Sequence, residues 1–114
     1  MPYEQKFLFS LLLTLIVEIP IVIFFIKYFY KYKALKNSQI IFAGFLASTL
    51  TLPYFWFILP VYISGRIPYI LIGESLVIII EAIIYWRLFG IKFKEALIIS
   101  LTANLASTLV GLLF

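Results

Sequence analysis

Three glutamates lie inside long apolar segments of this 114-residue chain, at Glu18, Glu74 and Glu81. A carboxylate at bilayer depth costs on the order of 2.5–3.5 kcal/mol on insertion scales, so such residues face a bundle interior or a watery cavity. A carboxyl group there can bind a cation, or accept and release a proton. Glu74 and Glu81 are seven residues apart, which is two turns along one helix face.

Polar residues continue from these glutamates as stripes along the apolar segments. Ser10, Thr14 and Glu18 recur every four residues, which is one face of a helix. Two other segments carry polar or small residues at steps of three and four: Gly44, Ser48 and Thr51 in one, and Ser100, Asn104, Ser107 and Gly111 in the other. Small residues of this kind also mark ordinary helix–helix contacts in membrane bundles, so that interpretation stays open.

The polar residues predict an intramembrane site. We expect it to be formed by Glu18, Glu81, Asn104 and Glu74, with support from Ser48, Ser107, Thr14, Pro20 and Pro53. In this hypothesis Glu18 and Glu81 bind a cation or proton as equivalent carboxylates of the two halves. Asn104 is a neutral ligand, and Glu74 lines the outer entrance. The alternative is structural: the glutamates hydrogen-bond to Asn104 or to a serine of the Leu-Ala-Ser-Thr-Leu segment that occurs twice in the chain, or Glu81 snorkels to pair with a nearby arginine or lysine.

Two prolines lie close in sequence to these polar residues and each free one backbone carbonyl. Pro20 follows Glu18 by two residues and withholds its amide from the Ile16 carbonyl, and Pro53 does the same to Thr49. Freed carbonyls beside a carboxylate and hydroxyls could coordinate Na⁺ or relay a proton. Prolines are also common in membrane helices without such a role.

Several kinds of chemistry are excluded by composition. The sequence contains no cysteine, histidine or aspartate. Disulfides, thiol catalysis, histidine acid–base chemistry and the usual zinc sites are therefore ruled out. Intramembrane proteolysis would need a serine–lysine pair, paired aspartates or a metal, and no lysine lies in the apolar interior. We expect neither an enzyme nor a metal or cofactor.

The elements that must position these residues are membrane-spanning helices. Hydrophobic residues make up 65% of the chain, charged residues 12%, and mean hydropathy is +1.16. Four apolar segments are each long enough to cross a bilayer, at about 20 residues per crossing. They run from Phe7 to Ile26, Ile40 to Ile63, Tyr69 to Trp86, and Ala96 to Phe114. The prediction is an all-α polytopic membrane protein with one transmembrane domain over residues 1–114.

Orientation follows from the basic residues. Seven of the nine flank the first and third connectors (Lys27, Lys31, Lys33, Lys36, Arg87, Lys92 and Lys94). The positive-inside rule then places both termini outside. This asymmetry explains the net charge of +4, so we expect no nucleic-acid partner. Because the chain is small and shows no targeting sequence, we expect a prokaryotic plasma membrane. Tyr54 and Trp56 lie deeper than the other interfacial aromatics and are expected to pack or hydrogen-bond inside the bundle.

The chain also contains an internal repeat signal. Leu-Ala-Ser-Thr-Leu occurs at Leu46–Leu50 and at Leu105–Leu109, each time after an embedded glutamate and a basic loop. The pattern predicts two parallel two-helix halves, about residues 7–63 and 69–114, related by an axis along the membrane normal.

A resemblance to a group of proteins rests mainly on the second half. Glu81-Ala82-Ile83-Ile84-Tyr85, followed by Glu95-Ala96-Leu97, Ser100, Ala103-Asn104-Leu105, Ser107 and Gly111, resembles small four-span membrane proteins of archaea and bacteria. It covers about the last forty residues and implies no established activity. In size and in its first-span glutamate the chain is also similar to small multidrug exporters, but the rest of their pattern is missing, so this likeness is analogy.

The leading functional hypothesis is a small transport or channel protein for a cation, a proton or a small solute. Four helices leave little room for a pore, so we expect a homo-oligomer or a partner membrane subunit in the lipid bilayer. The alternative is a non-transporting structural subunit or assembly factor of a larger membrane complex.

Overall fold

A computed structural model describes residues 2–113 of the chain. In chain order the elements are α1 (Tyr3–Phe24), a π-helical turn (Phe25–Phe29), α2 (Asn37–Pro53), a second π-helical turn (Tyr54–Ile58), α3 (Leu59–Tyr62), α4 (Arg66–Phe89) and α5 (Phe93–Leu113). The π-helical turns continue α1 and join α2 to α3. The result is four helical stretches of 27, 26, 24 and 21 residues, each long and apolar enough to cross a membrane. The all-helical class and the four candidate spans are confirmed.

Each stretch begins three or four residues before the start that hydropathy predicts. The first helix starts at Tyr3 where Phe7 was expected, and the last at Phe93 where Ala96 was expected. The helices are longer than the apolar segments because backbone hydrogen bonding continues past the apolar core of a span. The added residues are partly polar, so hydropathy did not include them.

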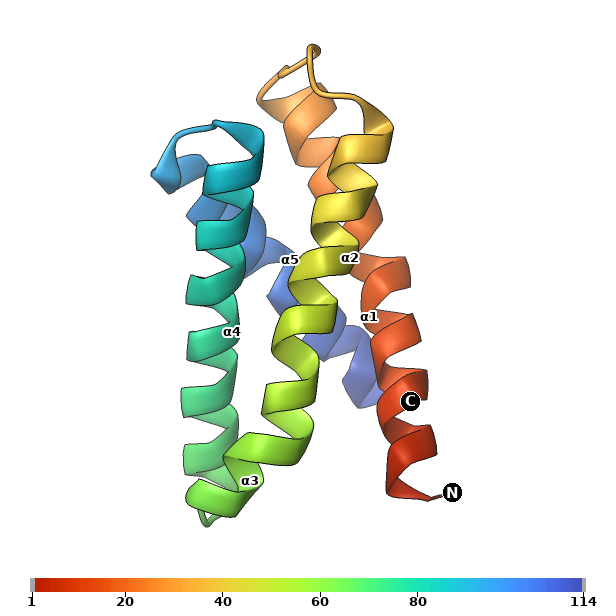
Figure 1. Cartoon of the computed structure of the whole chain (residues 1–114), viewed down its shortest axis with the longest axis vertical. Coiled ribbons are helices and arrows are strands. Elements are labelled where there is room, and N and C mark those ends of the chain that lie inside the picture. The colour runs from red at the N-terminus through yellow and green to blue at the C-terminus, as the bar shows by residue number, and fades with distance from the viewer. Residues whose placement is uncertain (1, 114) are drawn as a thin grey trace.

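The four long helices form a bundle. Helix α1 packs against α2 and α5, and α4 packs against the same two helices, so α1 and α4 lie at opposite corners (Figure 1). The longest extent is 42 Å, comparable to a bilayer with its headgroups. Both termini lie toward the end that carries the α3–α4 connector, called here the terminal end. The opposite end carries the connectors 30–36 and 90–92 and is called here the basic end.

Two glycines permit close helix contacts. A Cβ added at Gly44 would lie 2.8 Å from Ile19 Cγ1, where α2 meets α1. At Gly73 it would lie 2.4 Å from Phe55 Cε2, where α4 meets the second π-helical turn. These two glycines therefore serve helix packing, as small residues do in membrane bundles.

Pro60 shapes the terminal end of the second stretch. Because proline has no amide hydrogen, the carbonyls four and five residues earlier lose a helical donor. Two phenols replace it: Tyr3 OH donates to the Trp56 carbonyl at 2.5 Å, and Tyr69 OH donates to the Phe55 carbonyl at 2.6 Å. The proline distortion thereby ties α1 and α4 to the second stretch.

Tyr54 and Trp56 differ in their environment. Tyr54 is 62% exposed, so the prediction that it packs inside the bundle is wrong. Trp56 packs against Tyr3 and Phe7, with ring centroids 5.1 and 5.9 Å apart. In the π-helical turn, consecutive side chains point in different directions from those in an α-helix. A prediction based on the α-helical period therefore places them on the wrong faces.

The half of the bundle nearest the basic end is tightly packed and mainly apolar. Its core consists of Val22, Ile26, Ile40, Ala43, Ala47, Tyr85, Phe89, Ile91, Ala96, Ile99 and Ala103. Large apolar side chains such as Leu12, Ile16 and Leu109 are exposed on the outward faces. A chain that buries polar groups and exposes apolar ones fits lipid as its solvent.

The two connectors at the basic end are joined by a hydrogen bond. Tyr32 OH donates to the Glu95 carboxylate, and Glu95 Oε1 also accepts the Lys92 amide at 3.2 Å, which caps α5. The bond to Glu95, followed by desolvation, raises the pKa of Tyr32 above its usual 10.0. Gly90, at φ 68°, ends α4 in the left-handed conformation that glycine adopts easily.

Candidate functional site

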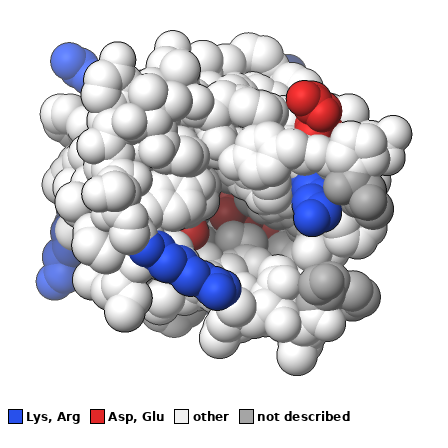
Figure 2. All heavy atoms as spheres, turned by 90° about the horizontal axis from the view of Figure 1, so that it is seen from below, with Lys and Arg blue, Asp and Glu red and all other residues white. Residues whose placement is uncertain are grey.

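A cavity of about 300 Å³ lies between the four helices in the half nearest the terminal end. Seen from that end, the molecule is hollowed at its centre, and acidic atoms are visible within the hollow (Figure 2). All four helical stretches contribute to the lining, which consists of Ser10, Thr14, Glu18, Leu52, Phe55, Trp56, Ile70, Glu74, Val77, Asn104, Ser107, Thr108, Gly111 and Leu112.

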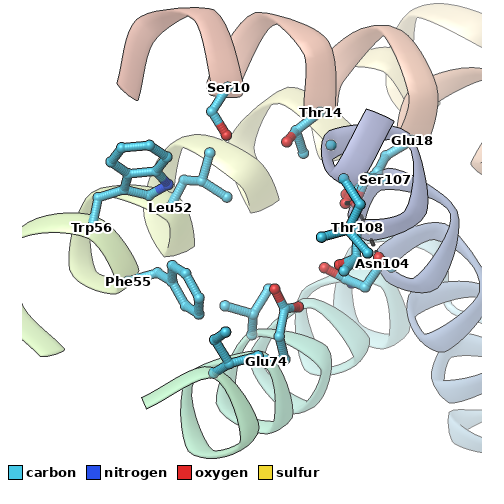
Figure 3. A pocket seen from close by; sticks show the side chains of 14 residues that line it. Ser10, Thr14, Glu18, Leu52, Phe55, Trp56, Glu74, Asn104, Ser107 and Thr108 are labelled. Atoms are coloured by element: carbon cyan, nitrogen blue, oxygen red, sulfur yellow. Dashed lines mark hydrogen bonds between the residues drawn. The ribbon is translucent and has the colours of Figure 1, made fainter. Parts of the chain in front are cut away.

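Five predicted site residues line this cavity: Thr14, Glu18, Glu74, Asn104 and Ser107 (Figure 3). Ser10 and Thr14 line its wall, and Glu18 lies one turn deeper with only 2% of its surface exposed. Glu74 reaches the cavity from α4 and Asn104 from α5. These side chains therefore lie on the cavity-facing sides of their helices.

Glu81 lies behind the cavity and is fully buried. Asn104 Nδ2 donates to Glu81 Oε1 at 2.8 Å and to the Ser100 carbonyl at 2.8 Å, which uses both amide hydrogens. Asn104 thus separates the inner carboxyl from the cavity and holds it in place. Glu18 and Glu81 do not line one chamber, although the sequence hypothesis gave them equivalent roles.

Each buried glutamate contacts one hydroxyl that also contacts a backbone carbonyl. Ser107 Oγ is 2.7 Å from Glu18 Oε2 and 3.1 Å from the Asn104 carbonyl. Thr51 Oγ1 is 3.1 Å from Glu81 Oε2 and 2.8 Å from the Ala47 carbonyl. A hydroxyl has one hydrogen to donate.

Because each hydroxyl has only one hydrogen, the contacts of each glutamate are consistent with two protonation states of its carboxyl group. When the hydroxyl donates to the carbonyl, the carboxyl must be protonated and donate to the hydroxyl oxygen. When the hydroxyl turns to the glutamate, it stabilises an ionised carboxylate. Rotation of Ser107 or Thr51 therefore lets Glu18 or Glu81 gain and lose a proton without a change of fold.

The two prolines predicted to support the site face away from it. Pro20 is exposed on the outward side of α1, and Pro53 borders a surface groove with Thr49 and Tyr54. Pro20 is two residues from Glu18, about 200° around the helix, so the carbonyl that it frees lies far from the carboxyl. Neither proline supplies a ligand to the cavity.

The predicted snorkelling pair of Glu81 does not form with Arg87. The guanidinium carbon of Arg87 lies 5.0 Å from the ring centroid of Trp86, in a cation–π contact at the basic end. Glu81 has Asn104 and Thr51 as partners instead.

Several site residues were missed from the sequence. Thr108 lies one turn beyond Asn104 and lines the cavity, so the same helical period could have identified it. Tyr85 lies one turn beyond Glu81 and is fully buried, although it had been assigned no role. Phe55 and Trp56 line the cavity because of the π-helical turn, and no sequence period signals that turn.

The site therefore consists of a polar cavity lined by Glu18 and Glu74, and an inner carboxyl, Glu81, which lies behind Asn104 and is hydrogen-bonded to it. Within residues 2–113, no group of three or more carboxylates is arranged to hold a metal ion. Comparisons with models of protein families, with curated proteins and with solved structures gave no match for this chain.

Proposed function

We propose that this chain is a small integral membrane transport or channel protein that gives protons or small cations access to buried carboxyls. The observation that carries the proposal is the cavity with Glu18 and Glu74 in its lining and Glu81 hydrogen-bonded behind it. Buried carboxyls that only hold helices together need no solvent-sized space beside them. A cavity of about 300 Å³ is at the lower end of the range typical of small-ligand sites.

The proposed orientation places the basic end in the cytoplasm. Seven of the nine basic residues lie at that end, so the positive-inside rule favours it. The cavity then opens to the outside of a prokaryotic plasma membrane, where both termini also lie. The packed apolar half toward the cytoplasm closes the path in this conformation, as expected for one state of an alternating-access transporter.

We also infer that the two halves are a parallel repeat. Exchanging α1 with α4 and α2 with α5 reproduces the observed neighbour relations. The glutamates follow the same exchange: Glu18 bonds to Ser107 of α5, and Glu81 bonds to Thr51 of α2. The cavity of one protomer does not reach the basic end, so we propose that the protein assembles as a homo-oligomer.

We expect Glu18→Gln to lower ion flux into proteoliposomes by at least about tenfold, equivalent to about 1.4 kcal/mol in the barrier. Glutamine keeps the shape and the bond to Ser107 but cannot exchange a proton or carry charge. Proton flux is followed with an internal pH dye and sodium flux with a radiotracer. The matched control is Glu4→Gln, which removes an exposed glutamate of α1 outside the cavity lining.

The same experiment separates transport from the structural alternative. If Glu18→Gln leaves flux unchanged and lowers only the thermal stability in detergent, the glutamate serves packing and the transport proposal is wrong. In that case the chain is better described as a structural subunit of a larger membrane complex.

A further inference from the structure

The lining of the cavity has an apolar side and a polar side (Figure 3). The apolar side, called here the apolar wall, comes from the second helical stretch and consists of Leu52, Phe55 and Trp56. The opposite side carries polar groups of α1 and α5, which belong to Glu18, Asn104, Ser107 and Thr108. The carboxyl group of Glu74 extends into the space between the two sides. The cavity is therefore amphipathic.

The charged groups of the lining are acidic. Within the described residues the lining contains two carboxyl groups, those of Glu18 and Glu74, and no lysine or arginine. Basic side chains are visible at the rim of the hollow (Figure 2), but they do not belong to the lining. A concave site with charges of one sign and walls of low dielectric attracts ligands of the opposite sign. The cavity therefore favours a cation over an anion or a neutral molecule.

Glu18 Oε1 lacks a hydrogen-bond donor. Glu18 is 2% exposed, and its Oε2 contacts the Ser107 hydroxyl at 2.7 Å, but Oε1 has no partner within residues 2–113. Among the buried side-chain atoms without a partner in this range, it is the only one on a residue that lines the cavity. Buried polar atoms in folded proteins are nearly always paired. A ligand in the cavity that carries N–H groups supplies the missing donor.

An organic cation fits this lining better than a metal ion. A hard metal ion takes about six oxygen ligands, whereas the apolar wall offers only hydrocarbon and aromatic groups to the cavity. Aromatic rings pack against hydrocarbon and also attract ammonium groups through their faces. A space of about 300 Å³ holds about ten non-hydrogen atoms if each takes the volume of a water molecule. The size and the lining therefore suit a small amine.

We propose that the cavity binds a protonated amine with a small hydrocarbon body. The ammonium group donates a hydrogen bond to Glu18 Oε1, Glu74 adds a second negative charge to the same cavity, and the hydrocarbon body packs against the apolar wall. Binding favours the ionised state of Glu18, in which the Ser107 hydroxyl donates to the carboxylate. The inference rests on the proposed transport function and names the class of cation that the cavity takes.

The test measures binding through tryptophan fluorescence in detergent micelles. The chain has two tryptophans, so Trp86→Phe leaves Trp56 of the apolar wall as the only reporter. The probe is phenethylamine. Phenethyl alcohol has nearly the same shape without the charge, and methylamine has the charge without the hydrocarbon body. We expect phenethylamine to bind saturably, with an affinity at least about tenfold higher than that of either comparison compound.

Glu18→Gln should weaken the binding of phenethylamine by at least about tenfold, because it removes the charge that pairs with the ammonium group. Glu74→Gln should also weaken binding and provides a second variant in case the first fails to fold. Glu4→Gln, at an exposed glutamate of α1 outside the lining, is the control and should bind phenethylamine as before.

Three results would overturn the amine site. The first is the absence of a saturable response to phenethylamine, which would show that the cavity holds only water. The second is an equal affinity for phenethylamine and for either comparison compound. The third is binding that neither Glu18→Gln nor Glu74→Gln weakens.

Uptake into proteoliposomes distinguishes failure of the amine site from failure of the proposed function. Because a neutral amine crosses bilayers unaided, uptake of labelled phenethylamine is counted relative to vesicles without protein. If phenethylamine binds as expected but neither the amine, protons nor sodium cross the membrane, the amine site stands and the transport function is wrong. If protons or sodium cross and phenethylamine does not bind, transport stands and the amine site is wrong.

Discussion

Gly111→Trp should abolish ion flux while leaving the bundle folded. Gly111 lines the cavity, and a Cβ added there meets no atom within 4 Å, so a large side chain can extend into the open space. An indole in a cavity of about 300 Å³ displaces most of the water that connects Glu18 to the terminal end. We expect flux to fall by more than about a hundredfold, equivalent to about 2.7 kcal/mol in the barrier.

The matched control is Gly111→Ala, which adds one methyl group to open space. It should keep wild-type flux and gain up to about 1 kcal/mol of stability, because alanine favours a helix over glycine. Full activity of Gly111→Trp in proteoliposomes, with the variant folded by circular dichroism, would show that ions do not pass through this cavity.

Asn104→Leu should lower the free energy of unfolding by about 2–3 kcal/mol, because it leaves the buried Glu81 without its amide donor. Leucine has nearly the same shape, so the loss reflects the amide hydrogen bonds to Glu81 and to the Ser100 carbonyl and not a packing defect. The quantity can be measured by denaturant titration in detergent micelles.

The double variant Asn104→Leu with Glu81→Leu completes the test. Replacing both partners with apolar groups of similar shape is often close to neutral, so stability should largely recover. Flux should not recover, because the inner carboxyl is absent. A double variant no more stable than Asn104→Leu would contradict the pairing of these two residues.

The sequence predicted the helices and the site stripes well where the pattern was regular. Ser10, Thr14 and Glu18 follow a helical period on one face, and all three line the cavity. Hydropathy located all four stretches because the outward faces are uniformly apolar. Asn104 or a serine of the repeated pentapeptide was expected to bond to the glutamates; in the structure Asn104 bonds to Glu81 and Ser107 bonds to Glu18.

The remaining features depend on geometry that a helical period does not contain. The π-helical turn at Tyr54–Ile58 directs Tyr54 outward and brings Phe55 and Trp56 to the cavity. Whether Glu81 faces the cavity or lies behind Asn104 depends on the crossing of α4 and α5, which sequence spacing leaves undetermined. The outward position of Pro20 could have been derived from its 200° separation from Glu18.

The central claim is that water reaches the buried glutamates from the terminal end alone. Since the chain has no cysteine, single-cysteine variants report access without background. Two positions are replaced by cysteine, one at a time. Thr14 lines the same cavity as Glu18, whereas Ala47 lies in the packed core and is fully buried. A charged, membrane-impermeant thiol reagent should label Thr14→Cys from the side of the termini and not from the side of the basic connectors, and should leave Ala47→Cys unlabelled. Labelling of Thr14→Cys from the basic side, or from neither side, would contradict the account.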